Sequence, residues 1–250
     1  MNTGGKTYYD PKGFQVTAPV ADLHFWFTGR NRLICWALAR YFPGMKSFCE
    51  VGCGGGIVLG AVERRFPGVR TIGVDYLEDG LEGARRRGLR ADLRRGDILN
   101  LGSVGEPDVV GVFDVLEHIP DHGAACAGLH SAVKKGGGLV VTVPQHRFLW
   151  SFSDEMGLHQ RRYGRGELVR TVEAAGFKVL RVTSFVSLLL PVLWLSRLRF
   201  SSGRAARSEF HPGRVANALC RAAMELDFWL IRAGFSLPMG GSLLLVAVRR

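Results

Sequence analysis

The sequence predicts an α/β protein whose mostly parallel sheet has seven strands and helices on both faces. Short apolar runs rich in β-branched residues alternate with stretches of helical pattern, and a glycine turn directly follows the first apolar run. Because the strands of such a sheet run parallel, the turns that follow them meet at one edge, where ligands bind. We therefore expect a functional site at the carboxyl ends of the strands.

The chain, 250 residues long, is sufficient for one domain with additions. The predicted strands cover residues 46–51, 70–75, 91–95, 108–114, 138–143, 177–183 and 242–248. The last of these follows a break in the strand–helix rhythm, and we expect it to run antiparallel. The predicted units are an N-terminal cap segment (1–45), a core (46–183), an apolar and basic helical insertion (184–241) and a last core strand (242–250).

Two helices outside the core rhythm have clear limits. An aromatic and basic stretch that starts at His24 is expected to form a helix as far as about Tyr41, because Pro43 and Gly44 follow it. A second helix is expected from about Pro212 to Ala233, where it returns the chain to the last strand. Both would lie against the sheet.

The glycine turn after the first strand is the most informative local feature. Glycines at positions 52, 54, 55 and 56 let the backbone pass close to a ligand, and bare N–H groups at a helix start favour polar or anionic groups. A dinucleotide site would want another glycine where Ile57 stands. The second strand ends in Asp75, whose carboxylate can accept two hydrogen bonds from a ribose diol. The pattern predicts a small nucleoside cofactor.

Further motifs follow in register. They are RRGDI over residues 94–98, FDVLEHIP over 113–120 and GGGLVVTVP over 136–144. With the glycine turn, they resemble class I S-adenosylmethionine (SAM)-dependent methyltransferases over roughly residues 20–183. The octet most resembles the small-molecule branch that includes enzymes of quinone biosynthesis. The resemblance implies a Rossmann-like fold, SAM as cofactor and methyl transfer as the reaction.

The resemblance also implies which residues hold SAM. The turn would cradle the methionine and ribose portion, Asp97 and Ile98 would face the adenine, and Asp114 and Val115 would flank the methionine end. An arginine of the first helix, Arg30 or Arg32, could pair with the methionine carboxylate. The predicted cofactor-binding residues are Glu50, Gly52, Cys53, Gly54, Gly56, Asp75, Tyr76, Asp97, Ile98, Asp114, Val115 and Arg30.

The acceptor side is predicted from the residues after the fourth and fifth strands. Methyl transfer from a sulfonium needs alignment above all, and a hydroxyl acceptor also benefits from a general base. The stretch from His146 to Tyr163 resembles the acceptor-side loop of bacterial envelope and natural-product methyltransferases, except that Leu158 replaces the usual glycine before the histidine. The predicted bases are His146 and His159, and the predicted substrate-binding residues are Trp26, His118, Trp150, Arg162 and Tyr163.

No metal is predicted. His146, Asp154 and His159 are residue types that bind metals, but their spacing is loose and no other cue supports a site. The five cysteines are odd in number and form no Cys-x-x-Cys pair, and residues 1–19 do not read as a secretory signal. We therefore expect a reduced, cytoplasmic setting without disulfides.

The net charge of +11 and the pI near 10.0 need an explanation. Either the genome prefers arginine, or the protein has an anionic partner such as a lipid surface, a phosphorylated substrate or nucleic acid. A methylase of amino nitrogens in nucleic acids would usually carry Asp/Asn-Pro-Pro-Tyr/Phe after the fourth strand. Here Asp114-Val115-Leu116-Glu117 stands instead, so we predict no nucleic-acid partner.

The insertion combines an apolar run with cationic residues. Phe185–Leu195 holds 11 residues and includes Pro191, which is too short for the roughly 20 residues that span a bilayer. Arginines follow at positions 197, 199, 204, 207 and 214. Residues 185–214 could lie in a membrane interface at the inner face of the membrane. Alternatively, the insertion packs on the core or forms a dimer contact; the oligomeric state stays open.

The resulting hypothesis is a SAM-dependent methyltransferase that acts on a hydroxyl of a small-molecule or lipid-linked acceptor, with an amine or a carbon as second choices. One alternative is a nicotinamide-dependent oxidoreductase, which Ile57 and the lack of a suitably placed Tyr-x-x-x-Lys pair disfavour. The other is a non-catalytic membrane- or protein-binding module on the same fold.

Overall fold

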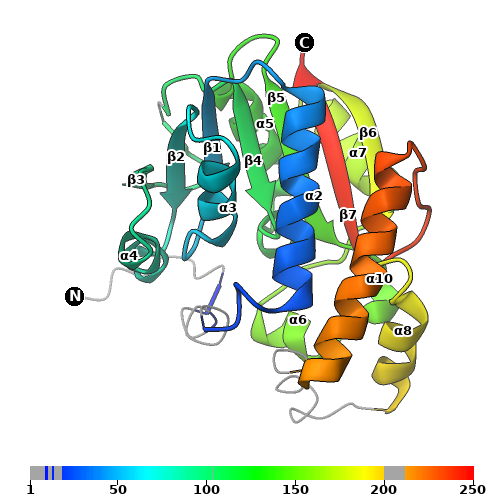
Figure 1. Ribbon diagram of the computed structural model, residues 1–250. Helices are drawn as coiled ribbons and strands as arrows, with labels where there is room; N and C mark the ends of the chain where they lie inside the picture. The colour runs from blue at the N-terminus through cyan, green and yellow to red at the C-terminus, as the bar shows by residue number, and fades with distance from the viewer. Residues whose placement is uncertain (1–8, 11–12, 14–18, 103, 200–211) are drawn as a thin grey trace.

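The computed structural model describes residues 9, 10, 13, 19–102, 104–199 and 212–250. Its sheet has seven strands in the order β3-β2-β1-β4-β5-β7-β6. Strands β1 to β5 pair in parallel, and β7 runs antiparallel between β5 and β6 (Figure 1). The predicted fold class is therefore confirmed, and the last strand is antiparallel as expected.

The strands lie close to their predicted positions. Their bounds are β1 Ser47–Val51, β2 Arg70–Asp75, β3 Asp92–Arg95, β4 Val109–Phe113, β5 Gly138–Pro144, β6 Phe177–Phe185 and β7 Ser242–Arg249. Every residue of β4 and β5 is buried. This burial explains why both strands appear in the sequence as continuous apolar runs: helices cover both faces of a parallel sheet.

One face of the sheet is covered by α2 (Phe25–Tyr41), α3 (Ile57–Arg65) and α10 (Arg214–Arg232), and the other by α5 (His122–Ala132) and α7 (Arg165–Ala174) (Figure 1). The remaining helical elements are α4 Glu78–Arg86, α6 Phe152–Met156, α8 Leu190–Arg199 and the 3₁₀ turns η1 Leu116–His118 and η2 Arg147–Leu149. Each face has its own buried apolar cluster.

Helix α2 has the limits that the sequence indicated. The His24 ring accepts a hydrogen bond from the Trp26 amide at 3.2 Å and caps the helix start. Helix α10 packs directly on α2, because Gly29 leaves room for the Met224 side chain: a Cβ on Gly29 would lie 2.6 Å from the Met224 Cε atom. The contact ties the N-terminal segment to residues far away in the sequence.

The region 184–241 divides into parts with different environments. Strand β6 continues to Phe185, and α10 contributes Phe228 and Ile231 to the buried cluster beneath α2. Helix α8 contacts η2 at the carboxyl end of the sheet. Arg204 and Arg207, which belong to the segment 185–214 that could lie in a membrane interface, are outside the described residues. Among the helices that the structure describes, none combines the length and the apolar character required to span a bilayer.

All five cysteines are free; they are Cys35, Cys49, Cys53, Cys126 and Cys220.

Candidate functional site

The glycine turn passes directly against the residue that follows β4. Gly52 adopts φ 76°, a conformation that favours glycine, and a Cβ there would lie 2.3 Å from the Val115 Cγ2 atom. Both the backbone conformation and the available space therefore require glycine at position 52. The close approach brings the ends of β1 and β4 together at the predicted edge.

The amides of this turn are mostly used inside the fold. Gly52 and Cys53 donate to the Val74 carbonyl at 2.7 and 3.0 Å, and Gly54 donates to the Asp75 Oδ2 atom at 2.7 Å. These three amides therefore already have partners within the fold. The Cys53 side chain is buried in the apolar cluster below α3, and the roles of Gly52, Cys53 and Gly54 toward a cofactor stay predictions.

Asp75 lies at the tip of β2, buried, with both carboxylate oxygens engaged. Oδ2 accepts the Gly54 amide, and Oδ1 accepts the Leu77 amide at 2.8 Å. Burial raises the pKa of Asp75 above its ordinary value, and these backbone hydrogen bonds only partly oppose the rise. Since each carboxylate oxygen has two lone pairs, Asp75 keeps acceptor capacity for a ligand diol.

Arg30, Asp75 and Asp114 lie near Glu50 at the ends of β1, β2 and β4. Arg30 Nη1 donates to Asp114 Oδ2 at 2.5 Å, and its guanidinium lies 4.4 Å from the Trp26 ring centroid. Burial raises the pKa of Glu50 to about 8; nearby Arg30 opposes this rise, and Asp75 and Asp114 add to it. The Oε2 atom of Glu50 is buried and has no hydrogen-bond partner in the described part of the chain.

This charge balance has a chemical consequence. Glu50 lies in a buried place near one arginine and two further acidic groups, Asp75 and Asp114, so a positively charged ligand would favour its ionised form. Asp114 is held there with φ 55°, an uncommon conformation for a residue other than glycine, and Thr142 Oγ1 donates to its Oδ2 atom at 3.1 Å. The predicted cofactor residues of these three strand ends therefore lie together.

The predicted adenine-side residues lie after β2 and β3. Asp97 Oδ1 accepts the Leu99 amide at 2.9 Å, and the Ile98 side chain is buried in the cluster on the α5 side. Tyr76 lies beside Arg95, whose Nε atom donates to the Tyr76 carbonyl at 3.3 Å. Their roles toward a ligand stay predictions.

On the acceptor side, a buried ion-pair cluster centres on Asp154. His159 Nδ1 lies 2.8 Å from Asp154 Oδ1, and Arg162 donates to both oxygens at 2.7 and 2.9 Å. Burial raises the pKa of Asp154, but the hydrogen bonds from His159 and Arg162 outweigh this effect and hold the pKa well below its ordinary value. In the sequence, Asp154 stood out only as a residue type that binds metals. In the structure, Asp154 is the residue that holds His159 and Arg162.

Tyr163 differs from its prediction. It is completely buried, its hydroxyl donates to the Leu116 carbonyl at 3.2 Å, and His122 Nδ1 lies 2.8 Å from that hydroxyl. No part of Tyr163 is available to a substrate, so its role is structural. Arg162 keeps its predicted place beside the acceptor region, but its guanidinium is largely committed to Asp154.

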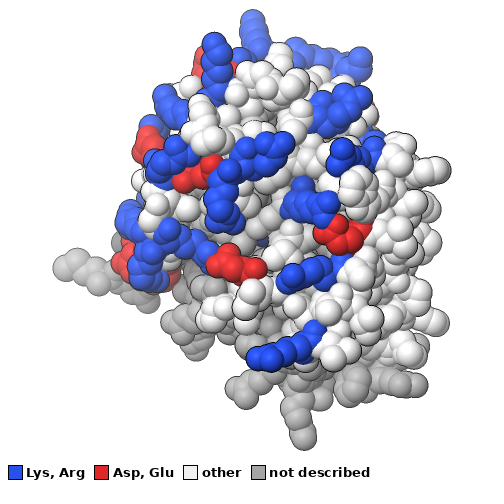
Figure 2. Space-filling model, in the orientation of Figure 1, with Lys and Arg blue, Asp and Glu red and all other residues white. Residues whose placement is uncertain are grey.

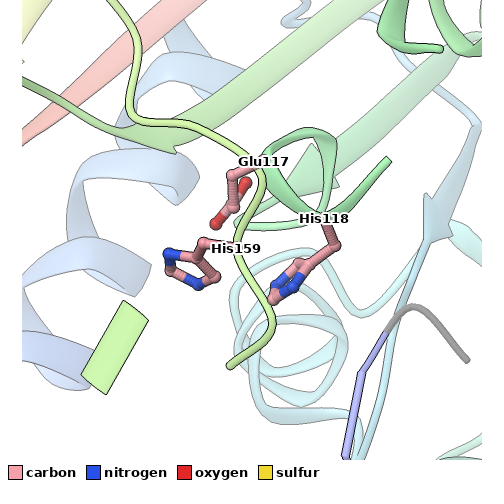
Figure 3. Close-up of side chains that lie close together, drawn as sticks. All are labelled: Glu117, His118 and His159. Carbon is pink, nitrogen blue, oxygen red and sulfur yellow. The ribbon is translucent and has the colours of Figure 1, made fainter. Parts of the chain in front are cut away.

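His118 and His159 come from separate segments and meet in this region (Figure 3). Their ring centroids are 4.6 Å apart, and Trp150 contacts His159 edge-on at 6.5 Å. Burial and nearby His159 lower the pKa of His118 to about 3, so His118 is neutral at physiological pH. His118, His159 and Trp150, three of the predicted acceptor-side residues, are therefore brought together.

His146 follows β5 with φ 61°, and its ring stacks on Phe148 at 4.9 Å between centroids. Its Nε2 atom is buried and finds no hydrogen-bond partner within the described residues. Burial and nearby Arg162 lower its pKa. His146 is therefore a neutral histidine with an unused nitrogen at the carboxyl edge of the sheet.

Part of the positive charge lies on the face of the molecule that carries α2 and α3 (Figure 2). Figure 2 shows more basic than acidic side chains on the face that carries α2 and α3. A groove of about 870 Å³ on this face is lined by five arginines, namely Arg32, Arg40, Arg64, Arg65 and Arg232. These five arginines thus form a basic groove on an outer surface.

Comparisons with known proteins agree with this geometry. The family model described as "Methyltransferase domain" matches residues 26–182. A protein of Mycolicibacterium smegmatis named "Probable S-adenosylmethionine-dependent methyltransferase" is 30% identical over 67% of this chain and 65% of its own length. The ubiquinone biosynthesis O-methyltransferase of Hahella chejuensis is 37% identical over 39% of this chain and 42% of its own length. The chain thus spans less than two thirds of the length of these relatives.

A solved structure shows the same fold. Magnesium protoporphyrin IX methyltransferase from Synechocystis, with SAH bound, superposes with a TM-score of 0.59 at 16% identity and covers 97% of each chain. At this identity, the likeness concerns the fold alone.

The protonation of Glu50 predicts a specific pH dependence of stability. Its pKa is about 8 in the folded protein and near 4.5 ordinarily, so between these values the folded state keeps a proton that the unfolded chain releases. The free energy of unfolding therefore falls as pH rises through this range, by at most about 1.4 kcal/mol per pH unit. The Glu50→Gln variant lacks this loss, so its advantage over wild type should grow from pH 5 to pH 8.

Urea unfolding of the ligand-free protein at pH 5, 6.5 and 8 measures this difference. Glu173→Gln on α7, which replaces an exposed residue, is the matched control and should follow wild type. A Glu50→Gln curve parallel to wild type at all three pH values would show that Glu50 is ionised in the folded protein.

Proposed function

The chain belongs to the class I SAM-dependent methyltransferases, and from this premise we propose that it transfers the methyl group of SAM to a hydroxyl of a small-molecule or lipid-linked acceptor. The observation that carries the proposal is the pairing of two sites at one sheet edge. Buried carboxylates around Arg30 lie beside the glycine turn, and neutral histidines lie after β4 and β5. The family model and the relatives described above are methyltransferases, which disfavours the oxidoreductase and the non-catalytic alternatives.

SAM would occupy the ends of β1, β2 and β4. Its sulfonium and ammonium groups are cationic and suit the surplus of carboxylate there, while Asp75 has acceptor capacity for the ribose diol. The buried Nε atom of Arg30 has no hydrogen-bond partner among the described residues, and it would donate a hydrogen bond to the methionine carboxylate. The cationic groups of SAM would thus meet acidic side chains, its carboxylate would meet an arginine, and its ribose diol would meet a hydrogen-bond acceptor.

His146 would accept the proton of the acceptor hydroxyl. A general base must be unprotonated and have a free nitrogen, and His146 meets both conditions through its lowered pKa and its unpartnered Nε2. His159 differs, because its Nδ1 is already bound to Asp154. We therefore assign His159 a role in shaping the acceptor site and His146 the proton.

An anionic group on the acceptor would fit this region. Arg197 of α8 is half-buried and close enough to Arg162 and Asp154 to interact electrostatically, and burial followed by nearby Arg162 lowers its pKa. Arg162 and Arg197, which come from distant segments, would both be attracted to a phosphate or carboxylate of the acceptor.

The surface around this region would fit the interface between a membrane and water. Helices α6 and α8 lie at the same end of the molecule (Figure 1), and η2 contacts α8. Large apolar side chains are exposed on these elements, with Val192 at 62% and Trp194 at 51%. The exposed set is Phe148, Phe152, Met156, Leu188, Val192, Trp194 and Leu195, and the exposed Arg147 stands next to Phe148. An anionic lipid surface would contact both the apolar and the cationic groups.

Calorimetry with SAM tests the cofactor proposal. Wild-type protein should bind SAM, and Asp75→Ala should weaken binding by at least about tenfold, because a charge-assisted hydrogen bond is lost. Asp79→Ala removes an exposed carboxylate of α4 and serves as the control. Absence of heat with SAM beside clear binding of NAD would refute the proposal, and unchanged affinity in Asp75→Ala would refute the ribose role.

The His146→Gln variant tests the base. Transfer of label from methyl-labelled SAM to an extract of lipids and metabolites should slow by about 10²–10⁴-fold, with SAM affinity unchanged. In wild type, the rate should fall on acidification at a pH below the ordinary histidine pKa of 6.5, and the variant should lose this limb. His130→Gln on α5 is the control and should transfer label at the wild-type rate. A wild-type rate in His146→Gln would exclude His146 as the base.

Vesicle flotation tests the membrane contact. The protein should float with phosphatidylglycerol vesicles and not with phosphatidylcholine vesicles at low salt, and Trp194→Glu should reduce flotation at least about fivefold. Leu180→Glu, at an exposed position of β6, should float like wild type. Equal flotation of Trp194→Glu and Leu180→Glu would show that α8 does not carry the contact.

A further inference from the structure

We propose that Glu117, His118 and His159 bind one divalent transition-metal ion, with Zn²⁺ as the best match. Their three ligand atoms all lie within 4.8 Å of one another, which the structure shows for no other set of three metal-ligating residues among those it describes. Figure 3 shows the three side chains converging from η1 and from the segment after α6. Two imidazoles and one carboxylate with an open fourth position form a ligand set typical of catalytic zinc.

Unsatisfied polar atoms point to a ligand at this place. Glu117 is 1% exposed and His118 7% exposed, and the Glu117 Oε2 and His118 Nδ1 atoms have no hydrogen-bond partner in the described part of the chain. A buried polar atom without a partner costs about 1–3 kcal/mol. A metal ion would give both atoms a partner at once.

His159 is already oriented for coordination. Its Nδ1 bonds to Asp154, which leaves Nε2 as the nitrogen with a free lone pair. Asp154 is fixed in turn by two hydrogen bonds from Arg162. A carboxylate that holds the second nitrogen of a histidine ligand is the usual outer arrangement of metal-bound histidines.

Backbone contacts hold the two contributing segments together. The Gln160 amide donates to the Glu117 carbonyl at 2.8 Å, directly beside two of the ligands. Arg161 donates to the Pro120 carbonyl at 2.9 Å, and Tyr163 donates to the Leu116 carbonyl. Zinc bonds of about 2.0–2.2 Å place ligand atoms about 3.3–3.6 Å apart, so binding of the ion would draw the three ligand atoms closer together within this frame.

Asp114, three residues before Glu117, is a poor fourth ligand. Its Oδ2 atom accepts from both Arg30 and Thr142. The open coordination position would therefore be left for water or for an acceptor oxygen.

The chemical use of the ion rests on the proposed function, although the binding of the ion does not. An acceptor hydroxyl bound to the ion would lose its proton more easily, and His146 Nε2 would take that proton. The resulting oxygen anion would attack the methyl carbon, and the bond between that carbon and the sulfur would break to release S-adenosylhomocysteine. The proton on His146 would then leave to water.

Metal titration tests the proposal without reference to activity. Wild-type protein freed of metal with EDTA should bind one equivalent of Zn²⁺ in calorimetry, and Co²⁺ in its place should give the intense visible bands of a tetrahedral site. His159→Gln should weaken Zn²⁺ binding at least about 100-fold, and Asp154→Asn about 10–100-fold. His130→Gln removes a histidine outside the cluster and should bind Zn²⁺ like wild type.

Circular dichroism and SAM binding accompany each variant. Where His159→Gln fails to fold, the near-isosteric Glu117→Gln takes its place, with the same expected loss of Zn²⁺ binding. No Zn²⁺ binding by wild type, or wild-type affinity in both Glu117→Gln and His159→Gln, would overturn the metal proposal. In those cases, retained SAM binding leaves the proposed function intact, whereas Zn²⁺ binding without SAM binding refutes the function and leaves the metal site.

Discussion

A buried ion pair between Arg30 and Asp114 connects helix α2 to the end of β4, and the arrangement of the site depends on it. Without the guanidinium, Asp114 would add to the unfavourable burial of Glu50 and Asp75. The same arginine is held by the Trp26 ring, and α2 is held by α10 through the close contact of Gly29 with Met224. A helix from the start of the chain and one near its end thus determine where the cation stands between the strand ends.

Much of the fold could be predicted from the sequence because its signals are local. Buried parallel strands appear as continuous apolar runs, and turns after strands carry glycine or an acid whatever the distant contacts are. Asp75 and Asp114 lie where spacing placed them, as does the last strand. The family was also recognisable, since each of its motifs is short and lies within one continuous stretch of the chain.

The features that could not be predicted from the sequence are contacts between distant segments. The turn amides of Gly52, Cys53 and Gly54 bond to β2, and the Tyr163 hydroxyl bonds to η1; neither pairing leaves a periodic trace in the sequence. Asp154 carries the acceptor-side cluster through residues five and eight positions later, a spacing that a search for pairs with Arg and His could have detected. The meeting of residues 117 and 159 depends on backbone contacts that only the folded chain shows.

The position of β7 has a consequence for how the chain acquires its structure during synthesis. Strand β6 has no partner other than β7 in this sheet, and β7 also pairs along the whole of β5. As residues 242–249 leave the ribosome after all other strands, the two exposed strand edges of β5 and β6 must wait for them. During this interval, the nascent protein presents two unpaired apolar edges, which is the kind of surface on which chains pair wrongly with one another. The order of the strands therefore makes the completion of the sheet one of the last events in folding.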